Sequence, residues 1–276
     1  MLCVINFYKE SIMSFKLTAL AFTSLLVVNL AAAQTAAPAA PKAPEPEYTL
    51  SYNLGAVTDY RFRGISQTSK KPALQGGVDF AHKSGLYLGA WASNVNWVRT
   101  FNGANKSNLE LDWYGGYKTE VAKNTTLDLG LISYQYPGNN SGAAGTVGGG
   151  AFSNANTTEI YGGLTYGIYT AKYNRSTGDF LGNLRSKGSN YIDLSAAVDI
   201  GNGITVTPHI GRQVVANTVA ANYTDYSVTL AKDLGGGLTV SGALTGTTSR
   251  NPGFYVDNSG KFIASNAFVL GAKYSF

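Results

Sequence analysis

The chain is poor in cysteine, in charge and in long apolar runs. Its 276 residues include a single cysteine, Cys3, and only 13% of them are charged. Because Cys3 falls in a segment that we expect to be removed, the mature chain has no disulfide framework, no thiolate metal site and no cysteine for lipid attachment. We therefore predict no metal centre and no cofactor.

The longest apolar run is too short to span a membrane as a helix. Residues 17–30 (LTALAFTSLLVVNL) form a run of about 14 residues, whereas a spanning helix needs ~20. Lys16 before the run and the alanines at 31–33 after it are typical of a signal peptide and its cleavage site. Residues 1–33 are thus predicted to be a signal peptide, with Met13 as an alternative start. A mature chain that enters a membrane must then do so with strands.

Proline is concentrated in one early segment. Residues 34–47 (QTAAPAAPKAPEPE) are rich in proline and alanine and show no hydrophobic period. This composition favours a semi-rigid, extended spacer. We expect it to precede a single domain at 48–276.

The charge balance argues against a nucleic-acid partner. The net charge of +5 is modest, and no run of basic residues forms the stripe that such binding needs. Glycine (33 residues) and tyrosine (18 residues) are abundant instead. That combination is typical of many strands joined by turns, with aromatic rings at a membrane–water interface.

From Tyr48 onward, apolar residues alternate with polar or small ones, which is the period of strands. The last segment shows it most clearly, because Phe268, Leu270 and Tyr274 share one face while the residues between them are small or polar. Segments of about ten residues cross a bilayer at a tilt, and single-chain barrels have an even strand number. We predict an all-β, up-and-down antiparallel transmembrane β-barrel of about twelve strands, at 48–60, 73–82, 85–95, 108–119, 125–136, 158–168, 169–175, 190–200, 203–212, 223–232, 237–247 and 266–276.

The connections between these segments alternate between short and long. Short links are expected at 82–85, 200–203 and 233–237, and long polar loops at 96–107, 137–157, 176–189, 213–222 and 248–265. Outer-membrane barrels have short periplasmic turns and long external loops. Both ends of the domain should therefore face the periplasm.

A soluble β-sandwich is the alternative fold, because its strands also alternate between two faces. Alternation alone does not separate the two. The signal peptide, the even strand number, the alternating loop lengths and the terminal aromatic residue favour the barrel.

Several segments closely resemble the TorF family of porins. They are 57–95, which contains RFRGISQT and WASNV, then 109–118 (LELDWYGGYK), 158–167 (TEIYGGLTYG) and 223–240 (YTDYSVTLAKDLGGGLTV). The resemblance covers essentially the whole barrel and implies an outer-membrane location and a pore-forming role, without naming a solute. Tyr274 and Phe276 also look like the terminal signal that the barrel-assembly machinery reads.

An enzyme is not predicted, and no catalytic residue is assigned. A hydrolase of this architecture needs a histidine beside a nucleophile. Only two histidines exist: His82 falls on a short turn, and His209 faces the lumen, where it reads as a polar lining residue.

The residues that face the lumen carry most of the functional information. Fewer bases than acids are found there, and an unpaired buried ion costs several kcal/mol, so we expect a water-filled passage rather than an ion-paired plug. The residues assigned to the lumen are Asp59, Arg61, Arg63, Asp79, Glu110, Asp112, Lys118, Asp128, Glu159, Lys172, Asp193, Asp199, His209, Asp225 and Lys273.

The expected outer end is basic and the strand ends are aromatic. A basic rim can pair with anionic lipid and lipopolysaccharide head groups or draw anions towards the mouth. It comprises Arg61, Arg63, Lys70, Lys71, Arg99, Lys106, Arg175, Arg185, Lys187, Arg250 and Lys261. Aromatic girdles are expected from Tyr48, Tyr60, Phe62, Tyr136, Tyr169, Tyr223, Tyr274 and Phe276.

These patterns together predict an outer-membrane porin that allows passive diffusion of small hydrophilic solutes or ions. The alternative is a non-conducting barrel for adhesion or envelope structure.

Overall fold

A computed structural model describes residues 46–249 and 251–276. The predicted signal peptide at 1–33 lies outside the described residues. So does the predicted linker at 34–47, except for its last two residues.

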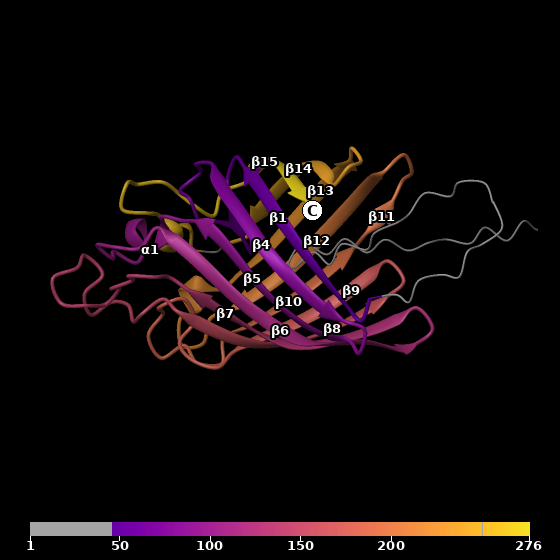
Figure 1. Cartoon of the computed structure of the whole chain (residues 1–276). Coiled ribbons are helices and arrows are strands. Elements are labelled where there is room, and N and C mark those ends of the chain that lie inside the picture. The colour runs from indigo at the N-terminus through magenta and orange to yellow at the C-terminus, as the bar shows by residue number, and fades with distance from the viewer. Residues whose placement is uncertain (1–45, 250) are drawn as a thin grey trace, which may run out of the picture.

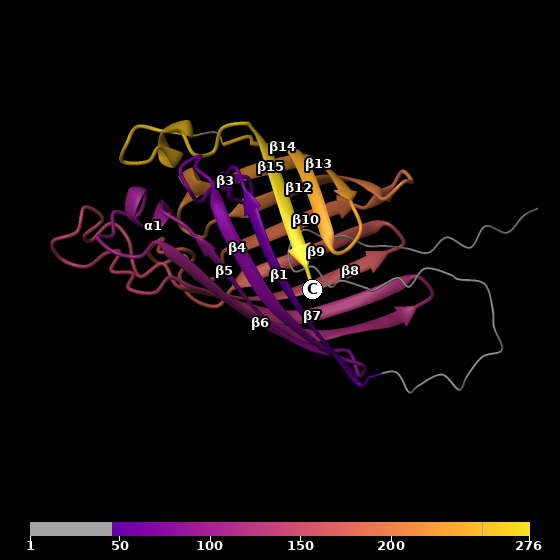
Figure 2. The same ribbon diagram turned by 45° about the horizontal axis from the view of Figure 1, so that its top comes forward.

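The described chain forms a closed antiparallel β-barrel (Figures 1 and 2). Its main sheet contains thirteen strands, of which β10 and β11 are two halves of one strand that breaks at Ala197, so twelve strands form the wall. Pairing of the first strand with the last closes the barrel. The predicted all-β, twelve-stranded barrel is confirmed. The wall strands are β1 (Tyr48–Val57), β4 (Ala73–His82), β5 (Leu86–Asn94), β6 (Leu109–Ala122), β7 (Thr125–Gln135), β8 (Thr157–Tyr166), β9 (Tyr169–Ser176), β10 (Asn190–Ala196) with β11 (Val198–Asp199), β12 (Ile204–Val214), β13 (Tyr223–Asp233), β14 (Leu238–Thr247) and β15 (Ala267–Ser275).

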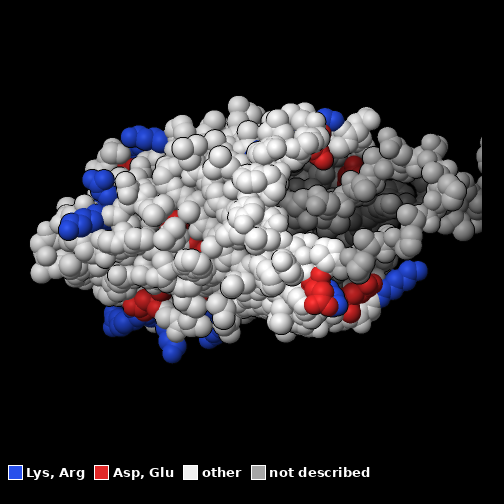
Figure 3. All heavy atoms as spheres, viewed as in Figure 1, with Lys and Arg blue, Asp and Glu red and all other residues white. Residues whose placement is uncertain are grey.

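The outer surface of the wall is apolar and the inner surface is polar. Leu54, Leu74 and Phe268 point outward and are 61%, 70% and 61% exposed, while the residues beside them in sequence point inward. Charged side chains gather towards the two ends of the barrel, and the band between them is largely uncharged (Figure 3). A soluble sandwich buries its apolar face, so this inside-out arrangement is that of a transmembrane barrel.

Loop lengths separate the two ends of the barrel. Turns at 83–85, 123–124, 167–168, 200–203 and 234–237 lie at one end, and loops at 58–72, 95–108, 136–156, 177–189, 215–222 and 248–266 lie at the other. The predicted alternation is therefore present throughout. In the part of the chain that the structure describes, the helices are short and lie in the long loops: α1 (Trp97–Thr100), η1 (Val219–Ala221) and η2 (Pro252–Tyr255). None of the helices at 46–249 and 251–276 has the length and apolarity to cross a membrane.

The first strand is shorter than predicted. β1 ends at Val57 rather than at residue 60, because the chain then turns inward at 58–60 and forms a separate hairpin, β2 (Arg61–Phe62) with β3 (Ile65–Ser66). Arg61 and Arg63, which the sequence places beyond the predicted strand at 48–60, lie in β2 and in the turn of this hairpin, so they are carried by the inserted loop and not by the barrel wall.

Candidate functional site

A short hairpin enters the barrel from the long-loop end. Its two strands pair only with each other, as a sheet separate from the wall. Arg63 and Gly64 form the turn with positive φ angles of 47° and 79°. A Cβ atom at Gly64 would lie 2.8 Å from Asp225 Cβ and 2.8 Å from Thr247 Cγ2, so the turn touches β13 and β14 where only glycine fits. We call residues 61–66 the plug hairpin.

Arg63 carries the contact of the plug hairpin with the opposite wall. Its guanidinium donates to both carboxylate oxygens of Glu159, at 2.6 and 3.1 Å, and to Gln213 Oε1 at 2.8 Å. Only 7% of the Arg63 side chain is exposed, and the Glu159 side chain is completely buried. The guanidinium also lies 4.7, 5.6 and 4.2 Å from the ring centres of Phe62, Phe180 and Tyr191.

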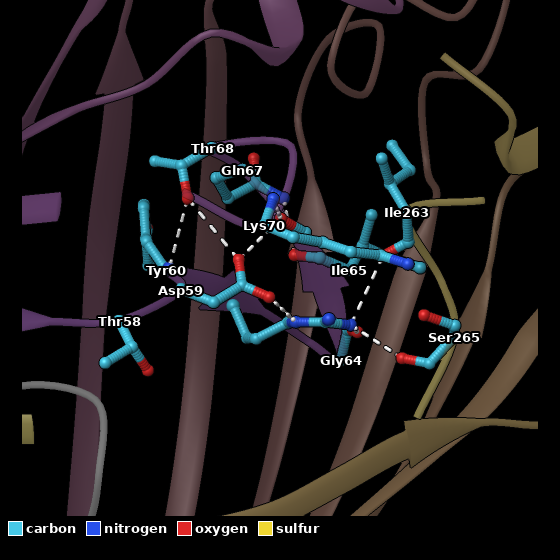
Figure 4. A network of polar contacts seen from close by, with 12 residues as sticks. Thr58, Asp59, Tyr60, Gly64, Ile65, Gln67, Thr68, Lys70, Ile263 and Ser265 are labelled. Atoms are coloured by element: carbon cyan, nitrogen blue, oxygen red, sulfur yellow. Dashed lines mark hydrogen bonds and ion pairs between the residues drawn. The ribbon is translucent and has the colours of Figure 1, made fainter. Parts of the chain in front are cut away.

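The base of the hairpin is tied to the last long loop (Figure 4). Arg61 Nε bonds Asp59 Oδ2 at 2.7 Å, and Ser66 Oγ donates to Asp59 Oδ1 at 2.6 Å. Arg61 Nη1 donates to the backbone carbonyls of Ile263 at 3.3 Å and Ser265 at 2.8 Å. Two loops that are distant in sequence are thus joined through one side chain.

Two apolar clusters close the barrel mouth above the hairpin. Between them they leave a cavity of only about 50 Å³. The first contains Ile65, Phe180, Val215, Ala221, Tyr223, Tyr255, Ile263 and Ala264, and the second Val95, Trp97, Val98, Ala104, Tyr134, Tyr136 and Ala155.

The predicted aromatic girdles are only half correct. Tyr48, Tyr169, Tyr274 and Phe276 are 48–66% exposed on the outer surface near the short-turn end, as expected. The other four do not face lipid, because the long loops fold inward and carry these rings into the mouth clusters. They are Tyr60, Phe62, Tyr136 and Tyr223.

The half of the lumen towards the short turns contains open space. A side chain that points into a filled barrel would be completely buried, whereas the inward-facing charged residues here are partly exposed. Those residues are Asp128, Lys172, Asp193, His209 and Lys273. The interior therefore has a polar vestibule at the short-turn end and a plugged mouth at the long-loop end.

His209 lies between two carboxylates in this vestibule. Its Nδ1 is 3.0 Å from Asp193 Oδ2, and its Nε2 is 3.3 Å from Asp225 Oδ1. Within the described ranges, no serine or threonine hydroxyl bonds to His209. His82 contacts Ser84 Oγ at 2.8 Å in an exposed turn. His209 thus has carboxylates but no serine or threonine beside it, and His82 has a serine but, within the described ranges, no carboxylate to orient its ring, so neither forms the three-part arrangement of a hydrolase.

Glu110 and Asp112 are buried without a counter-charge. They are 1% and 7% exposed, and neither forms an ion pair with a residue at 46–249 or 251–276. Tyr136 donates to Glu110 Oε1 at 3.2 Å, while Glu110 Oε2 and Asp112 Oδ1 accept no hydrogen bond from the described part of the chain. Both side chains, which the sequence assigns to the lumen lining, lie against the mouth cluster and not along the vestibule.

Four inward tyrosines lie flat against glycines, a contact that the sequence reasoning missed. At each of these glycines, an added Cβ would come within 2.0–2.6 Å of the tyrosine's hydroxyl or nearest ring atom. The flattened rings leave the lumen wide and direct their hydroxyls to carboxylates: Tyr114 to Asp79, Tyr87 to Asp128, and Tyr191 to Asp225. A sequence pattern that could have predicted these contacts is an inward-facing glycine on one strand opposite an inward-facing tyrosine on the next. The pairs are Gly89 with Tyr114, Gly116 with Tyr87, Gly130 with Tyr161, and Gly211 with Tyr191.

The remaining predicted lumen residues are scattered. Lys172 lies over the Tyr161 ring, 3.7 Å from its centre, and like Lys273 it forms no ion pair within the described ranges. Lys118 and Asp199 are exposed near the short-turn end. No group of three or more histidine, cysteine, aspartate or glutamate side chains at 46–249 and 251–276 is arranged to hold a metal ion.

Comparison with known proteins supports a porin-like fold. The model of a family described as a bacterial protein of unknown function, Gcw_chp, matches residues 40–276. The solved KdgM porin aligns with 82% of this chain and 99% of its own, with a TM-score of 0.51 and 8% identity. The NanC porin aligns with 82% and 99%, with a TM-score of 0.50 and 10% identity. Identities this low establish a shared fold and nothing finer.

The comparisons do not reach further. No curated protein sequence matches significantly. The porin-like barrel implied by the TorF resemblance is supported, whereas the matching family model carries a different name, so the TorF assignment stays a prediction.

Proposed function

We propose that this chain, which belongs to the Gcw_chp family of bacterial proteins of unknown function, is an outer-membrane channel for small hydrophilic solutes or ions. The observation that supports this most directly is the polar vestibule. Inward charges that are partly exposed, inside a wall whose outer face is apolar, are the arrangement of a barrel that holds water. The partly exposed side chains that line the vestibule are Asp128, Lys172, Asp193, His209 and Lys273.

A non-conducting barrel is the second candidate, and the plug hairpin is the observation in its favour. Arg63 reaches Glu159 on β8 and Gln213 on β12, so the hairpin crosses the lumen. A permanently plugged barrel would serve adhesion or envelope structure through its external loops. The two candidates differ in whether the wall encloses a pore once the hairpin is removed.

Conductance of a hairpin-less variant tests the proposal. With residues 61–66 replaced by two glycines, we expect discrete current steps in planar bilayers that are at least tenfold more frequent than in the full chain. Unchanged heat-modifiable mobility in gels would show that the barrel is folded. A folded hairpin-less barrel that carries no current would contradict the channel and favour the second candidate.

The long-loop end suits contact with lipopolysaccharide. Eight of the basic residues predicted for the rim are exposed, and Arg250 lies outside the described residues, whereas Asp179 is half-buried and Asp257 is buried. Arg61 and Arg63, which sequence reasoning added to this rim, are buried in the plug instead. We propose that the rim pairs with lipid phosphates, although the same charges would also draw anions to an open mouth. The exposed residues are Lys70, Lys71, Arg99, Lys106, Arg175, Arg185, Lys187 and Lys261.

Cysteine labelling tests the proposed orientation. Val147, in the loop at 136–156, is 82% exposed, and Leu234, in the turn at 234–237, is 54% exposed. A membrane-impermeant maleimide should label Val147→Cys on intact cells and label Leu234→Cys only after the outer membrane is permeabilised. Labelling of Leu234→Cys alone on intact cells would invert the topology.

A further inference from the structure

We propose that the plug hairpin is a movable gate and that the Arg63–Glu159 ion pair is the latch that holds it shut. This inference rests on the proposed channel function. It assigns the closure of that channel to one contact between the tip of the hairpin and the opposite wall.

The hairpin is built as a unit that can leave the lumen without damage to the wall. β2 and β3 make no backbone ladder with any wall strand, so withdrawal breaks no strand pairing of the barrel. The hairpin is carried by the segments 58–60 and 67–72, which connect neighbouring strands β1 and β4. Its attachment is therefore on one side, and its tip must be held by side chains.

Arg63 lies where a latch is needed. In the order of strands around the barrel, β8 and β12 are each four strands removed from the nearer of the two strands that carry the hairpin. The Arg63 guanidinium reaches both, through Glu159 and Gln213. A closed hairpin thus spans the full width of the lumen, and the hydrogen bonds that its tip makes to described wall residues come from this one guanidinium.

The wall presents a prepared acceptor for Arg63. Besides the two bonds from Arg63, Glu159 accepts bonds from Asn174 Nδ2 at 3.2 Å and from Tyr134 Oη at 3.3 Å. A buried bidentate pair of this kind is strong, and removal of one partner leaves the other charge buried and uncompensated. Loss of either charge should therefore weaken closure sharply.

Single-channel recording of latch variants tests the proposal. We expect Arg63→Gln and Glu159→Gln each to raise the fraction of time spent open at least tenfold over the wild type, and Arg63→Lys to give an intermediate value. Arg212→Gln is the matched control, because Arg212 lies beside Gln213 in sequence but is exposed on the outer face, and it should behave as the wild type.

The outcomes separate the two proposals. If the folded hairpin-less barrel conducts but the Arg63 and Glu159 variants open no more often than Arg212→Gln, the latch is overturned and the channel stands. If the hairpin-less barrel does not conduct at all, the channel and the latch fall together.

Discussion

Deletion of Phe276 should reduce the amount of folded barrel in the outer membrane at least tenfold while export across the inner membrane continues. Phe276 lies at the seam where the last strand meets the first. Its backbone N–H donates to Tyr52 O at 3.0 Å, and its own carbonyl accepts from Tyr52 N at 2.8 Å. Its ring stacks on Tyr52 and Tyr274, with centre distances of 5.8 and 5.6 Å.

The seam makes this residue unusually important. β1 pairs with β15 only from Asn53–Val57 to Gly271–Ser275, whereas its pairing with β4 runs along its whole length. Loss of the terminal residue therefore removes two backbone bonds from the shortest interface of the closed sheet. It also removes the residue that resembles the signal for barrel assembly.

The measurement is the yield of heat-modifiable protein in outer-membrane fractions. Phe276→Asp should behave like the deletion, because a charge would face lipid at the membrane edge, and Phe276→Trp should retain most of the yield. Normal yield from the deletion variant would show that neither the seam nor the assembly signal depends on Phe276.

Replacement of Gly89 by valine should destabilise the barrel by about 3 kcal/mol or more, the upper range for overpacking. A Cβ at this position would lie 2.3–2.5 Å from the ring and hydroxyl of Tyr114. The ring must then swing into the lumen, and its hydroxyl must leave Asp79, which is 8% exposed. The cost is thus both steric and polar.

The temperature at which the folded form is lost in gels measures this effect. Gly163→Val is the matched control, since Gly163 also faces inward but its Cβ would meet only ordinary contacts at 3.8 Å or more. In a double-mutant cycle, Gly89→Val combined with Tyr114→Ala should cost clearly less than the sum of the single changes. Additive costs would mean that Tyr114 does not occupy the space above Gly89.

The wall of this barrel was predictable because one simple period governs it. Each residue of β15 faces either lipid or the lumen, so Phe268 and Lys273 reveal their sides by position alone. The alternation of short and long connections then indicates at which end of the barrel each strand begins. Both this alternation and the two-residue period are local in sequence, and the observed strands match the predicted ones closely.

The plug and the mouth were not predictable in the same way. No period runs through 58–72 or 136–156, and nothing near Arg63 in sequence points to Glu159 or Gln213, which are far away along the chain. Alternation also tells which side of the wall a tyrosine takes, but not that it lies flat on a glycine of the next strand. The count of charges that face the lumen therefore predicted a water-filled passage. It did not reveal the plug hairpin, which fills the half of the lumen at the long-loop end.

The bonds from Arg61 to the carbonyls of Ile263 and Ser265 have a consequence for how the barrel comes apart. They join the loop that follows β1 to the loop that precedes β15, so they act as a clasp over the outer end of the seam. A hairpin that swings out takes the clasp with it and leaves the shortest strand pairing to hold the sheet closed. Permeability and resistance to unzipping are then opposed in this molecule, because the hairpin that carries the Arg63 contacts across the lumen also carries the Arg61 contacts at the seam.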